Sequence, residues 1–241
     1  MSPPPGYVAY GGTGSYGGTF RSIRSLSKAI VILLWIALPL QLLGLIDVLR
    51  LSSQAKKLLD GSISEQGFED STRAGFSLGV VLMAVPIAVL TIIWMYRMSS
   101  NLRGLGRVGQ TWVPGWAIGA WFVPPCVAYV VPWLMFKELW RGSDPAVAPG
   151  DPSWKQRPAR PLITVWWVLY GLVPILSFSS NVQFINDTRS NSITTRELAQ
   201  RYRDYAATSI VYAVIALAAT VVYLMLVRDL SSRHMQATRE A

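Results

Sequence analysis

Long apolar stretches with few polar interruptions dominate the hydrophobic pattern of this 241-residue chain. Four of them approach the roughly 20 residues that an α-helix needs to cross about 30 Å of hydrocarbon, and they cover 29–49, 76–96, 162–178 and 206–227. The shortest, 162–178, contains two tryptophans and a tyrosine, residue types that favour the membrane–water interface. The pattern predicts an all-α integral membrane protein with four transmembrane helices.

A fifth apolar segment, Pro114–Trp133, carries no charge but is interrupted by four prolines and two glycines. Proline removes a backbone donor and clashes with the preceding turn, and lipid cannot satisfy the groups that are freed. We therefore expect a broken re-entrant or interfacial segment within 112–141, which enters and leaves on the same side and turns near Pro124. Its glycines, Gly115 and Gly119, are expected to let another helix approach closely.

The end of this segment has the pattern of a short amphipathic helix that begins at Pro132 and is stopped by Gly142 and Pro145. Its two faces differ in character. One face carries the aromatic side chains Trp133, Phe136 and Trp140, and the other carries the charged side chains Lys137, Glu138 and Arg141. We expect this helix to lie in the headgroup layer with its aromatic face toward the lipid.

The distribution of lysine and arginine discriminates between the two topologies of the proline-rich segment. If the segment re-enters, 14 of the 22 basic residues face the cytoplasm and 8 face outside; if it crosses, the counts are 10 and 12. Cytoplasmic loops are enriched in lysine and arginine. We therefore expect a plasma-membrane protein with both termini in the cytoplasm, cytoplasmic segments of net charge +9 and outside loops of net charge +1.

Two polar tails are expected to flank a helical membrane domain that covers 29–227. Residues 1–28 are rich in proline, glycine and tyrosine and have too few aliphatic side chains to form a core, which predicts a disordered cytoplasmic tail. Residues 228–241 form the second cytoplasmic tail. Two pairs with capping-box spacing predict helix starts in the outside loops, and they are Ser62 with Glu65 and Thr194 with Glu197.

Polar residues within the predicted spans are few, and each has a structural interpretation. Asp47 lies near the outer end of its span, three residues before Arg50, which favours an ion pair at the membrane boundary. Gln41 lies mid-span and is expected to bond a neighbouring helix. Because no chain of carboxylates crosses the predicted bilayer, a proton-coupled pump is not indicated.

No catalytic constellation is visible in the sequence. A single cysteine, Cys126, and a single histidine, His234, give no basis for a multi-thiolate or histidine-built metal site within one chain. We expect no enzyme activity, no metal and no cofactor. Trp94, Arg97 and Asn101 recur on one face of the second span, and they indicate either a lipid-phosphate or partner site, or a snorkelling arginine beside an anchoring tryptophan.

Three blocks of sequence, Trp94–Asn101, Trp112–Pro124 and Pro132–Arg141, resemble an uncharacterised bacterial family of multi-span membrane proteins, the domain of unknown function 4328. The resemblance implies a membrane protein and brings no activity with it. The resemblance and the local pattern together indicate twelve candidate interaction or signature positions. They are Trp94, Arg97, Asn101, Trp112, Pro114, Trp116, Gly119, Trp121, Pro124, Pro132, Glu138 and Trp140.

These observations lead to two hypotheses of different classes. In the first, the protein is non-enzymatic and recruits or regulates a membrane or cytoplasmic protein partner through its basic cytoplasmic face and tryptophan-rich segment, while holding anionic lipid headgroups. Nucleic acid is not an expected partner, because the arginines are scattered over four segments. In the second, the protein is a small transporter or channel lined by residues 114–133.

Overall fold

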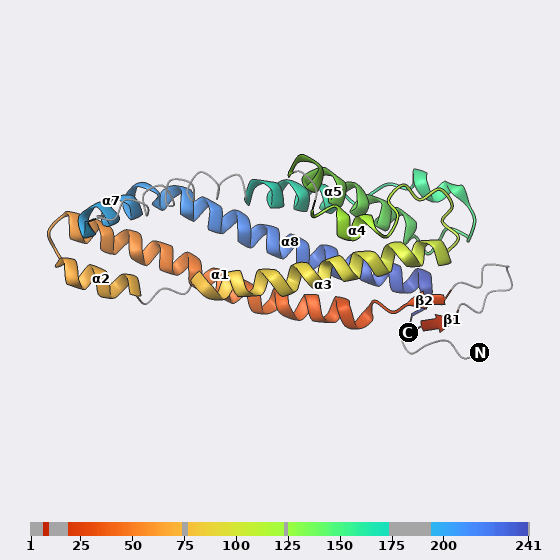
Figure 1. Ribbon diagram of the computed structural model, residues 1–241, viewed down its shortest axis with the longest axis horizontal. Helices are drawn as coiled ribbons and strands as arrows, with labels where there is room; N and C mark the ends of the chain where they lie inside the picture. The colour runs from red at the N-terminus through yellow and green to blue at the C-terminus, as the bar shows by residue number, and fades with distance from the viewer. Residues whose placement is uncertain (1–6, 10–18, 74–76, 123–124, 174–193, 241) are drawn as a thin grey trace. The chain divides into compact units, whose positions relative to one another are not determined.

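Two compact units make up the fold, as traced in a computed structural model that describes residues 7–9, 19–73, 77–122, 125–173 and 194–240 (Figure 1). Unit 1 comprises Met1–Leu34, Val85–Trp167 and Val222–Ala241. Unit 2 comprises Trp35–Ala84 and Val168–Val221. Three long helices contribute to both units, and they are α1 (Arg24–Leu59), α3 (Ser77–Gly104) and α8 (Ala206–Thr238).

The shorter elements each belong to one unit or continue from one into the other. Unit 1 contains an antiparallel pairing of three-residue strands, β1 (Tyr7–Ala9) with β2 (Thr19–Arg21), together with α4 (Trp116–Gly119), α5 (Pro125–Gly142) and the 3-10 helix η1 (Pro152–Gln156). Unit 2 contains α2 (Glu65–Arg73) and α7 (Thr195–Asp204). A further apolar helix covers Pro161–Val173.

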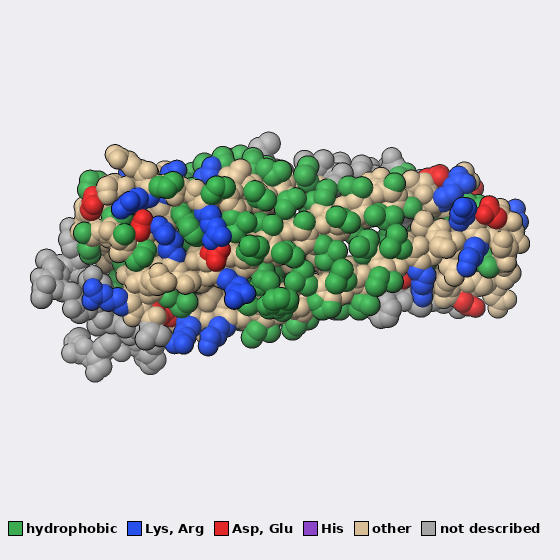
Figure 2. Space-filling view, turned by 180° about the vertical axis from the view of Figure 1, so that it is seen from behind, with side chains coloured by type: hydrophobic (Ala, Val, Ile, Leu, Met, Phe, Trp, Pro, Cys, Tyr) green, Lys and Arg blue, Asp and Glu red, His purple; other side chains and the backbone are tan. Residues whose placement is uncertain are grey.

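Three helices are long and apolar enough to cross a membrane, and they are Arg24–Leu59, Met83–Gly104 and Ala206–Thr238. Large apolar side chains on them point away from the protein, including Ile46, Val85 and Val214, which are 59%, 64% and 51% exposed. Figure 2 shows such side chains covering much of one face of the molecule. An outward apolar face is what lipid contact requires, so the prediction of a helical membrane protein is confirmed at this level.

The predicted fourth span, 162–178, is only partly described. Its helix is described over Pro161–Val173, and residues 174–178 lie outside the described part of the chain. Within unit 1, this helix contributes Trp166 to an aromatic cluster with Trp94, Phe136 and Tyr223. The Phe136 and Trp166 ring centroids are 4.9 Å apart, and those of Trp166 and Tyr223 are 5.1 Å apart.

In unit 2, α2 and α7 pack together and cover the end of α1. Phe68 on α2 and Ala199 on α7 are fully buried, together with Ala55 and Leu58 of α1. The capping box of Thr194 and Glu197 is confirmed at the start of α7, since both reciprocal hydrogen bonds are present. At the start of α2 the prediction is wrong by two residues.

The side chain that caps α2 is Ser64, whose Oγ accepts a hydrogen bond from the Gly67 amide at 3.2 Å. Two expectations within the spans are confirmed. The Arg50 guanidinium lies 3.3 Å from the Asp47 carboxylate, and Gln41 Nε2 donates to Thr220 Oγ1 of α8 at 2.9 Å.

Three predicted boundaries differ from the structure, each because a segment that reads as polar packs against other parts of unit 1. The N-terminal tail does not extend to residue 28, since α1 begins at Arg24 and Phe20 and Ile23 are buried. The C-terminal segment is not a free tail, because α8 continues to Thr238 and buries one of its faces. The helix expected to begin at Pro132 begins at Pro125 and contains Pro132, although its end at Gly142 is confirmed.

Candidate functional site

Three side chains on one face of α3 point into unit 1 and bind other parts of the protein, and they are Trp94, Arg97 and Asn101. Trp94 is fully buried, and its Nε1 donates to Ser231 Oγ of α8 at 3.1 Å. Arg97 Nη1 donates to the carbonyl oxygen of Ser22 at 2.7 Å. The hypothesis of a lipid-phosphate site at these residues is therefore replaced by an internal role, because their helix face packs against the N-terminal segment and α8.

Asn101 joins three segments of the chain. Its Oδ1 accepts the Arg21 amide at 2.8 Å and its Nδ2 donates to the Arg21 carbonyl at 2.9 Å, so the side-chain amide pairs with the backbone as a neighbouring strand would. This double pairing orients Nδ2 toward His234 Nε2, 3.1 Å away. His234 Nε2 must then accept, which places the imidazole proton on Nδ1, where it is donated to Ser143 Oγ at 2.7 Å.

The chain's penultimate residue caps its first long helix. The Glu240 carboxylate accepts hydrogen bonds from the backbone amides of Ile23 and Arg24 at 3.2 and 3.1 Å, and from the Ser22 hydroxyl. A negative charge at a helix N-terminus satisfies its unpaired amides and interacts favourably with the helix dipole. We call the group formed by Ser22, Asn101, Ser143, His234 and Glu240 the polar junction.

Glu138 on α5 holds the loop that follows α3. Its two carboxylate oxygens accept the backbone amides of Thr111 and Trp112 at 2.5 and 2.9 Å, and the residue is buried. The expectation that Glu138 lies on a solvated face is therefore wrong. Phe136 is fully buried as well, inside the aromatic cluster. Residues of both the predicted aromatic face and the predicted charged face of α5 therefore pack against protein.

Arg107 is buried and gathers the loop after α5 around its guanidinium. Nε donates to the Gly142 carbonyl at 2.9 Å, Nη1 to Ala148 at 2.9 Å, and Nη2 to Asp144 and Val147 at 2.9 and 3.0 Å. Asp151 caps η1 in the same region, and its bonds with the Ser153 amide and hydroxyl lower the pKa of this carboxyl.

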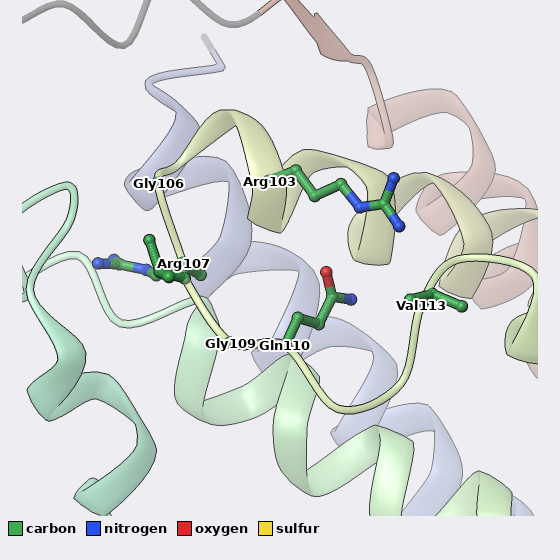
Figure 3. Close-up of a pocket in the computed structure, with 7 residues that line it drawn as sticks. Arg103, Gly106, Arg107, Gly109, Gln110 and Val113 are labelled. Carbon is green, nitrogen blue, oxygen red and sulfur yellow. The ribbon is translucent and has the colours of Figure 1, made fainter.

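An open hollow of about 340 Å³ lies beside this loop and is lined by Arg103, Gly106, Arg107, Val108, Gly109, Gln110 and Val113. Arg107 points away from the loop toward the carbonyls that it binds, whereas Gln110 extends toward α3 (Figure 3). Gln110 Nε2 is bound to Ser99 Oγ and the Trp112 carbonyl. The hollow thus offers mainly backbone and one exposed cation, Arg103, and no nucleophile with a base.

Trp140, near the end of α5, contacts two arginines. The guanidinium carbons of Arg160 and Arg233 are 5.6 and 4.9 Å from its ring centroid. Each of these arginines also has a carboxylate partner: Arg160 pairs with Asp229, and Arg233 lies 2.9 Å from Asp144. The arrangement joins α5, α8 and the intervening loop through cation–π and ionic contacts.

The tryptophan-rich segment before α5 is less enclosed than predicted. Trp112 and Trp116 contact each other edge to face, with ring centroids 5.6 Å apart. Pro114 starts the turn into α4, its carbonyl accepting the Ala117 amide at 3.0 Å. A Cβ added at Gly119 would meet nothing within 4 Å, so the predicted close helix approach there is wrong.

The same holds at Gly115, where an added Cβ would also meet nothing within 4 Å. Close approach occurs instead at Gly142, where an added Cβ would lie 2.7 Å from Leu102 Cδ2 of α3. Trp121 Nε1 is buried with no hydrogen-bond partner in the described part of the chain. Pro124 lies outside the described residues, and Pro132 is buried within α5.

Sequence reasoning missed the residues that complete the polar junction and its surroundings. The predicted site positions do not include Ser143, His234 or Arg107, yet all three are buried. The available signal was a helical period in the C-terminal segment: Leu230 and Ser231 precede His234 by four and three residues, and Ala237 and Thr238 follow it by three and four, and all five are buried.

Basic side chains are concentrated in unit 1, whose segments contain 14 lysines and arginines against 5 acidic residues, whereas unit 2 contains 8 of each. Figure 2 shows part of this basic surface. The cations of unit 1 that are exposed include Arg24, Lys28, Arg103, Lys155, Arg157 and Arg228. In the described residues, no group of three or more His, Cys, Asp or Glu side chains could hold a metal ion.

Comparison of the sequence with known protein families finds one match. A family model described as "Domain of unknown function (DUF4328)" matches residues 60–232, which is most of the chain and includes all twelve signature positions. No curated protein and no solved structure matches this chain.

Proposed function

The chain belongs to the family defined by this domain of unknown function (DUF4328), and because such membership brings no activity with it, we propose a function from the chemistry of unit 1. The protein is a non-enzymatic protein of the plasma membrane that recruits or regulates a membrane or cytoplasmic partner. Its working surface is the basic face of unit 1 together with the tryptophan-rich segment, and this face also holds anionic headgroups.

The charge asymmetry carries this proposal. Unit 1 has a net charge of +9 over its segments and unit 2 has a net charge of zero. The 14 basic residues of unit 1 are the same 14 that the re-entrant topology places in the cytoplasm. An anionic inner leaflet attracts such a surface by about 1 kcal/mol for each well-placed cation.

Hydrogen bonds of the polar junction support the same-side topology. His234 of α8 is bonded both to Asn101 in the last turns of α3 and to Ser143 directly after α5. Glu240 is bonded to the segment before α1. Groups on opposite sides of about 30 Å of hydrocarbon could not make these bonds. They favour four spans with a re-entrant segment and both termini in the cytoplasm.

The test is reconstitution of the full chain into vesicles that contain either zwitterionic lipid alone or a fraction of anionic lipid. Binding of labelled anionic lipid to the protein, measured by fluorescence energy transfer from its tryptophans, should exceed binding of the zwitterionic analogue. The preference should decrease as salt is raised, because surface charges are screened within about 10 Å at 0.1 M ionic strength. Equal binding of both lipids at low salt contradicts the proposal.

A transporter or channel is the second candidate, and one observation favours it. Trp121 Nε1 and Trp133 Nε1 are buried donors without a partner in the described part of the chain, in or next to the segment that would line a path. Buried donors of this kind require water or a solute as acceptor. Flux of ions and small neutral solutes into vesicles containing the protein tests this candidate, and absence of flux across the panel removes it.

A further inference from the structure

One face of α5 carries a row of four side chains that change from aromatic to cationic along the helix. Tyr129, Trp133, Lys137 and Arg141 follow at intervals of four residues, so that each lies about 6 Å further along the axis than the one before. Trp167, from the helix Pro161–Val173, stacks on both aromatic members, with centroid distances of 4.6 Å to each. All five side chains belong to unit 1.

The aromatic half of the row is rigidly held. Tyr129 Oη donates to the Trp167 carbonyl and Trp167 Nε1 donates to the Tyr129 carbonyl, both at 3.1 Å. The Lys137 ammonium lies 3.4 Å from the centroid of the Trp133 ring, a cation–π contact that fixes the nitrogen directly beyond the aromatic stack. The row is half-buried, so a ligand can reach it from the surface of α5.

The cationic half of the row has donors but no acceptors. In the described part of the chain, neither Lys137 nor Arg141 lies within 4.0 Å of a carboxylate oxygen or donates a hydrogen bond. Like charges one helical turn apart repel each other. Arg141 Nε and Trp133 Nε1 are buried and lack a partner in the same set of residues. Buried donors without acceptors are costly, and a bound anion would give the cationic half of the row the acceptor that it lacks.

The order of these groups matches one class of ligand. A phosphate accepts charge-assisted hydrogen bonds from lysine and arginine, and the Trp133 ring lies between Lys137 and the rest of the aromatic stack along the row. Tyrosine and tryptophan favour the membrane–water interface, the region that holds the headgroups of a glycerophospholipid. A soluble anion would use the cations and leave the aromatic stack beside them without a function.

We propose that this row is a binding site for an anionic glycerophospholipid, with its phosphate held by Lys137 and Arg141 and the rest of its polar region lying beside the aromatic stack. The inference rests on the proposed function, since it gives the general preference for anionic lipid one specific site. It also assigns Lys137 and Arg141 a role different from that of the exposed cations of unit 1.

The test measures lipid binding to the full chain in mild detergent by native mass spectrometry, with phosphatidylglycerol and phosphatidylcholine as probes. The double variant Lys137→Gln/Arg141→Gln should bind phosphatidylglycerol roughly 10- to 30-fold more weakly than the wild type, as loss of two well-placed cations requires. The control, Lys56→Gln/Lys57→Gln, removes the same charge from exposed positions of unit 2, outside the basic face, and should change binding by less than about threefold. Lys137→Arg/Arg141→Lys should retain most of the affinity.

Each outcome separates the site from the proposed function. Undiminished phosphatidylglycerol binding by Lys137→Gln/Arg141→Gln overturns the site while leaving the general preference for anionic lipid. Equal binding of both lipids by the wild type overturns both. Glycerol phosphate without acyl chains should not compete, and competition at equal concentration would identify a soluble phosphate ester as the ligand and overturn the lipid assignment. Near-ultraviolet circular dichroism of the variants without lipid should match the wild type and so report an intact aromatic stack.

Discussion

Asn101 illustrates how one side chain can organise a junction of several segments. Its amide satisfies the N–H and C=O of Arg21 and also donates to His234, and it is only 2% exposed. A buried amide with all of its groups paired adds stability, but removing one of its donors leaves several buried acceptors unsatisfied. The identity of residue 101 should therefore matter more than its size.

We expect Asn101→Asp to lower the free energy of unfolding by about 3 kcal/mol or more. The substitution is nearly isosteric, but a carboxylate cannot donate to the Arg21 carbonyl or to His234 Nε2, and it places a charge in a buried position. The measurement is denaturant unfolding in detergent. Gln156→Glu, at an exposed position, is the matched control and should change stability by less than about 0.5 kcal/mol. Similar stability of both variants would contradict this role.

Gly106 is a position where both the backbone conformation and a close neighbour require glycine. Its φ is +67°, and an added Cβ would lie 2.9 Å from the Gly150 amide nitrogen. We expect Gly106→Ala to cost about 1–3 kcal/mol, whereas Gly119→Ala should be neutral or slightly stabilising because its Cβ would lie in open space. Thermal unfolding of the two variants side by side gives the comparison, and a larger loss for Gly119→Ala would reverse the interpretation.

Among the helices, α5 has the most consequential packing. Its aromatic and acidic side chains were expected to separate a lipid face from a solvated face, but Phe136 enters the aromatic cluster of unit 1 and Glu138 binds the loop after α3. The C-terminal part of α8 behaves similarly, because polar positions there are buried against α3 and α5. Polarity in these elements therefore reflects specific internal partners rather than exposure to water.

We expect Glu138→Ala to release the loop that follows α3. Both of its hydrogen-bond acceptors are lost, which leaves the Thr111 and Trp112 amides unpaired at a cost of about 2–4 kcal/mol. Hydrogen exchange measured by mass spectrometry should accelerate at residues 111–112. Glu240→Ala is a reciprocal control, since it should accelerate exchange at residues 23–24 and leave 111–112 unchanged. Unchanged exchange at 111–112 in Glu138→Ala would show that the carboxylate does not hold the loop.

At the scale of the whole molecule, the two compact units also differ in their balance of charge. The segments of unit 1 meet through the polar junction and carry the excess of basic residues, and those of unit 2 are balanced. Outward apolar side chains on the three long helices complete the picture of a membrane protein whose polar segments are sorted into two groups. The proposed topology assigns the basic segments to the cytoplasm and the balanced loops to the outside.

Cysteine accessibility in intact cells tests this arrangement. After replacement of Cys126, a cysteine at Gln156 in unit 1 should be protected from a membrane-impermeant reagent, and a cysteine at Gln66 in unit 2 should be labelled. Both positions are exposed, whereas Ser143 is buried and would be a poor reporter in either topology. Labelling of Gln156→Cys from outside would place unit 1 outside the cell and remove the basis of the proposed function.

The sequence by itself determined the class of protein, the family and several local contacts. Long apolar stretches predict helices wherever lipid must be faced, because the backbone has no other way to satisfy its polar groups in hydrocarbon. Short-range features such as the Asp47–Arg50 ion pair and the Thr194 capping box were predictable since their geometry depends only on spacing within a helix.

Only the tertiary structure decided what the polar residues do. Whether Asn101, Glu138 and His234 face lipid, water or protein depends on which segments, distant in sequence, come to lie beside them, and no local period contains that information. The same reason applies to glycine, which is needed at Gly106 and Gly142 because other segments approach there, and is free to vary at Gly119 where none does. Partners distant along the chain, rather than residue type, assign these positions their roles.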